Sequence, residues 1–302
     1  MTYITQPRPS AADKRARLRA GLTGPTPVVA IGAHDAMSAS LVEGAGFDAV
    51  WVSGFGVSTM GHALPDLNLI TMTEALDAAC RIDAATRLPV IADCDNGYGG
   101  LINVVRTAVA YERAGIAAIC VEDNLFPKRN SLYLGQTMRE LIPVDEQVRR
   151  IRAAKAAQTT ADFVFIARVE ALIAGHGVAA ACERADAYAA AGADAILIHS
   201  KDKTLAEIEG FLAQWSGRGQ TPLVAVPTLF PDFTAEQLHA KGFQVIIWAN
   251  QLMRASVKAM EDTLGVLAAE RKAAAVDPHI APVNHVFELV DTAAGIALEE
   301  QA

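Results

Sequence analysis

Four stretches of the chain repeat one pattern, and this repetition constrains the fold more than any other feature. The stretches are EGAGFDAVWVSG at 43–54, ERAGIAAICVED at 112–123, AAGADAILIHS at 190–200 and AKGFQVIIWAN at 240–250. In each, a glycine suited to ending a helix precedes a continuous apolar run and then polar residues. A run without alternation is typical of a strand buried on both faces of a parallel sheet. Each stretch therefore predicts a helix end followed by a buried strand.

Further apolar runs lie between these stretches, at 27–32, 89–93, 163–168 and 222–227. Alanine-rich segments with helical periodicity separate the runs, at 73–86, 102–114, 145–157, 177–191 and 204–215. Eight strands that alternate with helices predict an α/β fold, a (β/α)8 barrel of the TIM type. We expect one domain over residues 1–302, with an extra segment before the first strand and C-terminal helices at about 278–302.

The composition argues against several kinds of partner. The net charge of −8 provides no basic surface for a nucleic acid, and no apolar run approaches the ~18 residues of a membrane span. No glycine-rich phosphate motif follows a predicted strand. The N-terminus lacks the apolar core of a signal peptide, and the four cysteines show neither zinc nor disulfide spacing. These features predict a cytoplasmic protein with reduced cysteines and no nucleic-acid or membrane partner.

Polar residues follow the predicted strands, at the barrel end where active sites of this architecture lie. They are His34, Asp35, Trp51, Ser53, Gly54, Asp93, Asp95, Glu122, Asp123, Arg168, Glu170, His199, Lys201, Thr228 and Asn250. A single acid after a strand is more often a turn former or helix cap. Alternation along an extended segment, however, would point Asp93 and Asp95 the same way, with Glu122 on the adjacent strand.

Three carboxylates in one place repel one another unless a cation lies among them. Oxygen ligands of this kind suit Mg²⁺ or Mn²⁺ better than zinc, so Asp93, Asp95 and Glu122 are the predicted metal site. Arg168 and His199 would face that metal and bind an anionic substrate, although a buried structural histidine is the alternative for His199. The turn at 53–56 offers backbone N–H groups for a carboxylate or oxyanion, and Trp51 is placed to line the same pocket.

Several motifs, in one order, resemble the phosphoenolpyruvate mutase/isocitrate lyase superfamily, and within it the branch that processes phosphonopyruvate. The resemblance runs from about Val28 to Arg254. The motifs are WVSGFGVS at 51–58, DCDNGYG at 93–99, VEDNLFPKRNSL at 121–132, ARVEALIAG at 167–175, AGADAILIHSK at 191–201 and VIIWANQLMRAS at 245–256. This resemblance implies a barrel whose eighth helix is exchanged between subunits of a homodimer or homotetramer.

The resemblance also implies roles for individual residues. Asp93 would bind Mg²⁺ directly, and Asp95 and Glu122 would bind it largely through water; Mn²⁺ or Co²⁺ are alternatives. Positions that match the family's contacts to the small-molecule substrate are Trp51, Ser53, Gly54, Phe55, Asp66, Asn130, Ser131, Leu132, Arg168 and His199. Lys128 would lie on a mobile gating loop at about 122–135. Lys128, Asn130, Ser131, Arg168, His199 and Thr228 are the residues expected to act in catalysis.

The gating loop separates the branches of the superfamily. Isocitrate and methylisocitrate lyases carry a K[KR]CGH signature here, whose cysteine transfers a proton, whereas this chain reads KRNSL at 128–132. The amide of Asn130 cannot relay a proton, so the chemistry of carbon–carbon lyases loses its acid. The HSK sequence at 199–201 also fits the phosphonate branch. Cleavage of a carbon–phosphorus bond is therefore the expected reaction.

The fate of the phosphoryl group distinguishes two activities. A hydrolase passes it to water and yields pyruvate and phosphate, with Asn130, Ser131 or Thr228 as candidates to place that water. A mutase returns it to the enolate oxygen and yields phosphoenolpyruvate. Mutases typically show EDKxxxKxNS, and Asn124 replaces the first lysine of that pattern, so we expect the hydrolase. The alternatives are the mutase, an oxaloacetate hydrolase or decarboxylase, and a non-catalytic keto-acid binding protein.

Overall fold

Eight parallel strands close into a barrel in which each strand pairs with its neighbours in chain order and β8 pairs with β1. The computed structural model describes residues 7–133 and 139–301. The strands are β1 Val28–Ala33, β2 Ala49–Val52, β3 Val90–Asp93, β4 Ala118–Glu122, β5 Val164–Val169, β6 Ala195–Ile198, β7 Leu223–Ala225 and β8 Phe243–Trp248. The barrel that the repeat predicts is confirmed.

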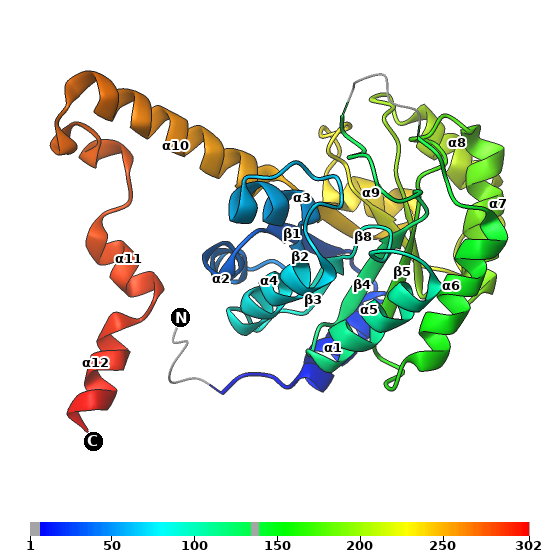
Figure 1. Cartoon of the computed structure of the whole chain (residues 1–302), viewed down its shortest axis with the longest axis horizontal. Coiled ribbons are helices and arrows are strands. Elements are labelled where there is room, and N and C mark those ends of the chain that lie inside the picture. Colours follow the sequence, from blue (N-terminus) through cyan, green and yellow to red (C-terminus); the bar gives the residue numbers. More distant parts are fainter. Residues whose placement is uncertain (1–6, 134–138, 302) are drawn as a thin grey trace. The chain divides into compact units, whose positions relative to one another are not determined.

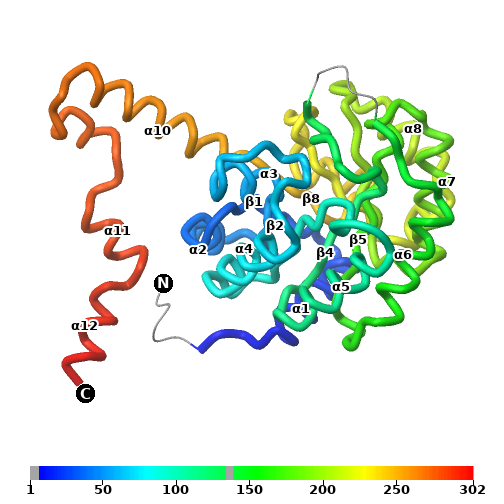
Figure 2. The backbone as a smooth tube through the Cα atoms, in the orientation of Figure 1, coloured from blue at the N-terminus to red at the C-terminus, as the bar shows by residue number. Residues whose placement is uncertain are grey.

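Helices follow the strands and cover the outside of the barrel (Figures 1 and 2). They are α2 Ala36–Gly44, α3 Gly54–Gly56, the π-helix η1 Val57–Gly61, α4 Met72–Ala84, α5 Leu101–Arg113, α6 Val144–Ala157, α7 Gly177–Ala190, α8 Ala206–Gln214 and α9 Ala235–Lys241. The long helices lie where the periodicity predicts them. Helix α1, Ala11–Gly21, precedes β1 and begins with a capping box between Ser10 and Asp13.

The glycines of the fourfold repeat explain why each helix stops before a strand. Gly46, Gly115, Gly192 and Gly242 all have positive φ, between 83° and 113°. A side chain disfavours this left-handed conformation, whereas glycine adopts it at little cost. The predicted helix ends are therefore confirmed at all four positions.

Apolar side chains fill the inside of the barrel. The strands contribute residues to one buried cluster, among them Ala30, Ile91, Val164 and Val245, and α1 adds Leu18 to it. Such a filled interior is a packed core and not a channel, so the polar groups can meet only at the ends of the strands. The core therefore fixes where the site can form.

The chain divides into two units, and residues 10–250 form the barrel unit. The described part of the other unit comprises residues 7–9 and 251–301. Its elements are α10 Gln251–Glu270, the 3₁₀ helices η2 Ala273–Ala275 and η3 Asp277–His279, α11 Val283–Leu289 and α12 Thr292–Glu300. Among the described residues, no helix combines the length and the apolar character that a membrane span requires.

Candidate active site

A cavity of about 60 Å³ lies where the strands end. The described residues that line it are Trp51, Ser53, Phe55, Asp66, Asp93, Glu122, Lys128, Arg129, Asn130, Ser131, Leu132, Arg168, His199, Val226, Thr228, Ala249 and Asn250. Every predicted site residue is in this lining except Gly54 and Asp95. These two lie directly beside it, because a Cβ added to Gly54 would be 3.1 Å from Asp93 Oδ2 and 3.3 Å from Asp95 Oδ1.

Asp93 and Glu122 line one side of the cavity and Asp95 lies beside Asp93, but not for the reason that the sequence suggests. Asp93 ends β3 and Glu122 ends the neighbouring strand β4. Asp95, however, has φ +50° and so is not part of an extended segment. The expected alternation along 93–95 is therefore wrong, and a left-handed turn, which aspartate tolerates, directs Asp95 instead. Its N–H donates to Asp93 Oδ1 at 3.3 Å.

The ammonium group of Lys128 lies between Asp95 and a further acid, Asp66. Lys128 Nζ is 2.7 Å from Asp66 Oδ1 and also bonds Asp95 Oδ1. Burial by itself would lower the pKa of Lys128, but Asp66 and Asp95, with Asp93 and Glu122 nearby, raise it well above its ordinary value. The lysine is therefore a buried cation, and it offsets the carboxylate repulsion from the loop side.

One carboxylate atom remains without a partner in this acidic cluster. Glu122 Oε1 is buried and has no hydrogen-bond partner among the described residues. Burial raises the pKa of Glu122 to about 8, even though Arg168 and Lys128 act against this. Burial likewise raises the pKa of Asp95 to about 6. An additional cation would lower both values and satisfy the orphaned oxygen.

The acidic cluster fits a hard divalent cation by its donor set, which consists of carboxylate oxygens alone. Within residues 7–133 and 139–301, no three acidic, histidine or cysteine side chains are arranged to ligate one ion directly. A site of this type would therefore need water or substrate oxygens to complete the coordination shell. Mg²⁺ commonly keeps several such ligands.

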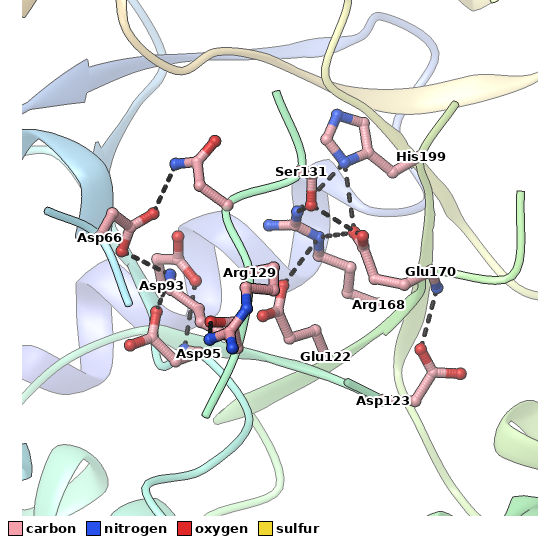
Figure 3. Close-up of polar contacts among 12 residues, drawn as sticks. Asp66, Asp93, Asp95, Glu122, Asp123, Arg129, Ser131, Arg168, Glu170 and His199 are labelled. Atoms are coloured by element: carbon pink, nitrogen blue, oxygen red, sulfur yellow. Dashed lines mark hydrogen bonds and ion pairs between the residues drawn. The ribbon is translucent and has the colours of Figure 1, made fainter. Parts of the chain in front are cut away.

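Cationic and hydroxyl groups form the opposite side of the cavity (Figure 3). Arg168 Nη2 donates to Ser131 Oγ at 2.8 Å and lies 3.1 Å from His199 Nδ1. Glu170 holds the three together: its Oε1 is 2.5 Å from Arg168 Nε and 3.2 Å from His199 Nδ1, and its Oε2 accepts from Ser131 Oγ at 2.7 Å. A guanidinium in such a setting can bind a carboxylate or a phosphonyl group.

The protonation of this side follows from its burial and its contacts. Burial lowers the pKa of His199, so the ring is neutral near pH 7. Its Nε2 is buried and has no partner within the described part of the chain. Burial would raise the pKa of Glu170, but Arg168 and the hydrogen bonds from His199 and Ser131 hold it well below its ordinary value. Glu170 is therefore ionised.

The loop after β4 closes over the cavity and is tied to the barrel mouth by side chains. Residues 122–133 of the predicted gating loop are described, and residues 134 and 135 lie outside the described residues. Asn130 Nδ2 donates to Asp66 Oδ2 at 2.7 Å. Asn68 Oδ1 accepts from the Lys128 N–H at 2.6 Å, and Asn68 Nδ2 donates to Asp95 Oδ2 at 2.9 Å. We call residues 122–133 the lid.

Two further predicted segments, the turn after β2 and the residues after β7, lie at the strand ends that form the cavity. The Ser53 hydroxyl caps the short helix α3 by accepting from the Gly56 N–H at 3.1 Å. Trp51 on β2 and Phe55 add apolar surface to the lining. Thr228, after β7, accepts a hydrogen bond at 3.2 Å from Asn250 Nδ2. The Gly56 N–H is therefore already paired within the turn after β2, and the anion-binding role of this turn stays a prediction.

Asn124, the residue on which the choice of hydrolase over mutase rests, lies away from the cavity. It is buried at the start of the lid, and its backbone forms an isolated antiparallel bridge with Leu141. It borders a different hollow, which is lined by lid residues 124–127 and 129 and by Arg139 and Glu140. Its side chain therefore has no contact with the cavity in which the phosphoryl group would move.

The sequence did not single out two residues that organise the site. Glu170 appears among the strand ends but received no role, because only the closed barrel shows that it bridges Arg168, His199 and Ser131. Asn68 lies in the long segment between η1 and α4, where no pattern marks it. Its φ of +58° is a conformation that asparagine tolerates better than most residues, a weak signal that does not identify its partners.

Comparison with known proteins places this geometry in one family. A sequence model described as phosphoenolpyruvate phosphomutase matches residues 18–268. Phosphoenolpyruvate phosphomutase of Tetrahymena pyriformis is 42% identical over 257 residues, which cover 85% of this chain and 84% of that protein. Phosphonopyruvate hydrolase of Variovorax sp. (strain Pal2) is 40% identical and covers 91% and 94%. The structure of a phosphonopyruvate hydrolase with oxalate and Mg²⁺ has a TM-score of 0.87 at 38% identity, covering 95% and 98%.

Proposed function

Because the chain belongs to the phosphoenolpyruvate phosphomutase family of the PEP mutase/isocitrate lyase superfamily, we propose that it is a Mg²⁺-dependent enzyme that breaks the carbon–phosphorus bond of 3-phosphonopyruvate. One observation carries this proposal. An acidic side with Asp93 and Glu122 faces a side with the Arg168 guanidinium and the neutral ring of His199 across a single cavity. A keto acid with a phosphonyl group presents matching ends to the two sides.

The two ends of the substrate would bind to different parts of the chain. The carboxylate and ketone oxygens would lie toward the turn at 53–55, where Ser53 and backbone N–H groups are available. The phosphonyl oxygens would accept from the Arg168 guanidinium and would lie beside Ser131 and His199. Trp51 and Phe55 would exclude water from the carbon chain between the two ends.

Asp93, Asp95 and Glu122 would hold Mg²⁺, or Mn²⁺ or Co²⁺, and the ion would supply the positive charge that stabilises an enolate. The unpartnered Glu122 Oε1 supports this assignment. The chain's own residues do the rest. Lys128, which is seated on Asp66 and Asp95, closes the lid, and Arg168 stabilises the charge on the phosphoryl group as it moves.

In the proposed reaction the carbon–phosphorus bond breaks and its electron pair stays with the pyruvyl fragment as an enolate. The phosphoryl group then bonds either to the enolate oxygen or to water. We favour the enolate oxygen, and therefore a mutase, for two reasons. Lys128, Asn130 and Ser131 match the rest of the mutase pattern. Asn124, the residue that differs from this pattern, does not border the cavity. The hydrolase stays the second candidate because a hydrolase relative is 40% identical.

Phosphorus NMR distinguishes these outcomes. The protein is incubated with Mg²⁺ and phosphonopyruvate, and in a parallel sample with oxaloacetate. A phosphoenolpyruvate signal is expected. Inorganic phosphate with an equal amount of pyruvate would replace the mutase by the hydrolase. Proton NMR follows pyruvate and oxaloacetate, which contain no phosphorus. An unchanged phosphonopyruvate signal in phosphorus NMR, with consumption of oxaloacetate in the proton spectrum, would contradict both and favour the oxaloacetate activity.

The remaining parts of the proposal concern the whole protein. We propose a homodimer or homotetramer in the cytoplasm, with an eighth helix exchanged between subunits, as the resemblance implies. We also propose that residues 1–302 act as one functional domain. The negative net charge supports a small-molecule substrate in place of a nucleic acid.

A further inference from the structure

Glu170 is a buried carboxylate that the proposed reaction leaves without a role. It is 0% exposed, and it is absent from the described lining of the cavity. It is not part of that lining, yet its two oxygens contact three residues that are: Arg168, His199 and Ser131. A buried charge is costly unless its partners and hydrogen bonds are well placed, so its position requires a reason.

Arg168 has two carboxylates within reach, and they lie on opposite sides of it (Figure 3). Its Nε is 2.5 Å from Glu170 Oε1 and 3.4 Å from Glu122 Oε2. Glu122 belongs to the acidic side of the cavity. If Glu170 were absent, the Arg168 guanidinium would move toward Glu122. Its Nη2 would then lose its contacts with His199 and Ser131. The nearer carboxylate therefore holds Arg168 more closely than Glu122 does and limits the approach of the guanidinium to the acidic side.

Glu170 is itself held rigidly. Its backbone N–H donates to Asp123 Oδ1 at 2.9 Å. The other oxygen of Asp123 accepts from Arg184 Nη1 at 2.9 Å and from Tyr188 OH at 2.8 Å, and both of these residues belong to α7. A chain of buried hydrogen bonds thus runs from α7 to the end of β5. Such a supporting layer is what a precisely placed anion site requires.

We propose that Glu170 is a positioning residue that holds Arg168, His199 and the lid residue Ser131 around one anion site, in which the Arg168 guanidinium donates to a phosphonyl group, and that it limits the approach of Arg168 to Glu122. Ser131 joins this site only when the lid is closed, because its hydroxyl donates to Glu170 from the lid. Closure of the lid and completion of the anion site are then one event. This inference rests on the proposed function for the identity of the phosphonyl ligand.

Two unreactive probes separate positioning from general damage. Methylphosphonate carries the phosphonyl group alone, and oxalate carries the chelating pair of oxygens alone. Calorimetric titrations with Mg²⁺ present compare the wild-type chain with Glu170→Gln. We expect Glu170→Gln to weaken methylphosphonate binding about 10- to 100-fold and oxalate binding less than about twofold. Loss of a negative charge would by itself strengthen anion binding, so a loss of affinity reports the displaced donors.

Glu112→Gln is the matched control, because Glu112 is also a buried carboxylate with several hydrogen bonds, at the end of α5. It should leave the affinities for both probes unchanged. Should Glu170→Gln fail to fold, Glu170→Asp keeps the charge but retracts it by one methylene, and should show the same selective loss. Equal losses for the two probes, no loss, or no methylphosphonate binding by the wild-type chain would each overturn the inference.

Failure of the proposed function has a different signature. A wild-type chain that leaves phosphonopyruvate unchanged in phosphorus NMR contradicts the enzyme activity. The selective loss of methylphosphonate binding in Glu170→Gln would still support Glu170 as the organiser of an anion site.

Discussion

Individual carboxylates at this site are ionised only where specific neighbours offset their burial. Glu170, with three donors around it, has a depressed pKa, whereas Glu122, with an unpartnered oxygen, has a pKa raised to about 8. Both are buried in one protein, at the ends of adjacent strands. The pKa values of the two residues differ because their hydrogen-bond partners and neighbouring charges differ, and not because one of them is buried more deeply. Single substitutions here should therefore change function more than their size suggests.

Replacement of Asp93 by Asn should remove most of the metal-dependent turnover. The amide keeps the shape of the side chain but loses the charge that would bind the cation, and we expect turnover to fall at least about 100-fold. Phosphorus NMR at increasing Mg²⁺ concentrations measures this. Asp77→Asn, at an exposed ion pair with Arg81, is the control. Turnover near that of the wild type would show that Asp93 does not hold the metal.

The pH dependence of stability should report Glu112. Its carboxylate accepts from the N–H groups of Thr159 and Thr160, and these bonds lower its pKa from 4.5 although burial opposes them. A carboxylate whose folded pKa is depressed stabilises the fold above the unfolded pKa, and this stabilisation is lost as the pH falls through the folded value. We expect Glu112→Gln to cost about 1 to 2 kcal/mol near pH 7 and less at low pH.

Urea unfolding of Glu112→Gln and the wild-type chain, between neutral pH and about pH 3, measures this difference in the free energy of unfolding. If the difference between the two proteins were constant with pH, the hydrogen bonds to Glu112 would not depend on its charge.

At the scale of elements, the lid shows how a loop can be part of a site without regular structure. Its position depends on hydrogen bonds from side chains outside it. Asn68 accepts from the Lys128 N–H, and Arg139 Nη2 donates to the carbonyl oxygens of Asn130 and Tyr133 at 2.8 and 3.1 Å. A few bonds of this kind are worth about 1 kcal/mol each, so the lid can open during turnover.

Asn68→Ala should loosen the lid, because the variant loses the bond to the lid residue Lys128; the other lost bond, to Asp95, lies outside the lid. Trypsin cleaves after lysine and arginine, so cleavage after Lys128 or Arg129 should be about fivefold faster, which corresponds to one lost hydrogen bond. A looser lid should also admit water and raise the ratio of phosphate to phosphoenolpyruvate. Asn103→Ala, at an exposed position on α5, is the control. Equal cleavage rates would show that Asn68 does not hold the lid.

On the scale of the whole molecule, the C-terminal unit carries apolar surface that a single chain leaves exposed. Val283, Phe287 and Ile296 are 66%, 50% and 52% exposed, and they lie on α11 and α12. Exposed apolar residues this dense are typical of surfaces that another protein covers. A second copy of the chain fits the proposed oligomer.

Phe287→Asp should therefore weaken self-association. Loss of a buried aromatic side chain from an interface commonly costs about 2 kcal/mol or more, which would raise the dissociation constant more than about tenfold. Sedimentation velocity over a range of concentrations measures this. Asn284→Asp adds the same charge to the same helix without removing an apolar group, and it should have little effect. A wild-type chain that sediments as a monomer would contradict the proposed oligomer.

The sequence by itself determined the alternation of helices and strands and the end of the barrel at which the polar residues meet. Both depend on short-range features, namely left-handed glycines such as Gly115 and apolar runs such as 117–121. Only the tertiary structure decided which polar residues contact one another. Glu170 reaches Ser131, Asn68 reaches Lys128, and Asn124 faces away, because barrel closure and the path of the lid set these distances. Local patterns contain no information about partners that are 39 or 60 residues apart.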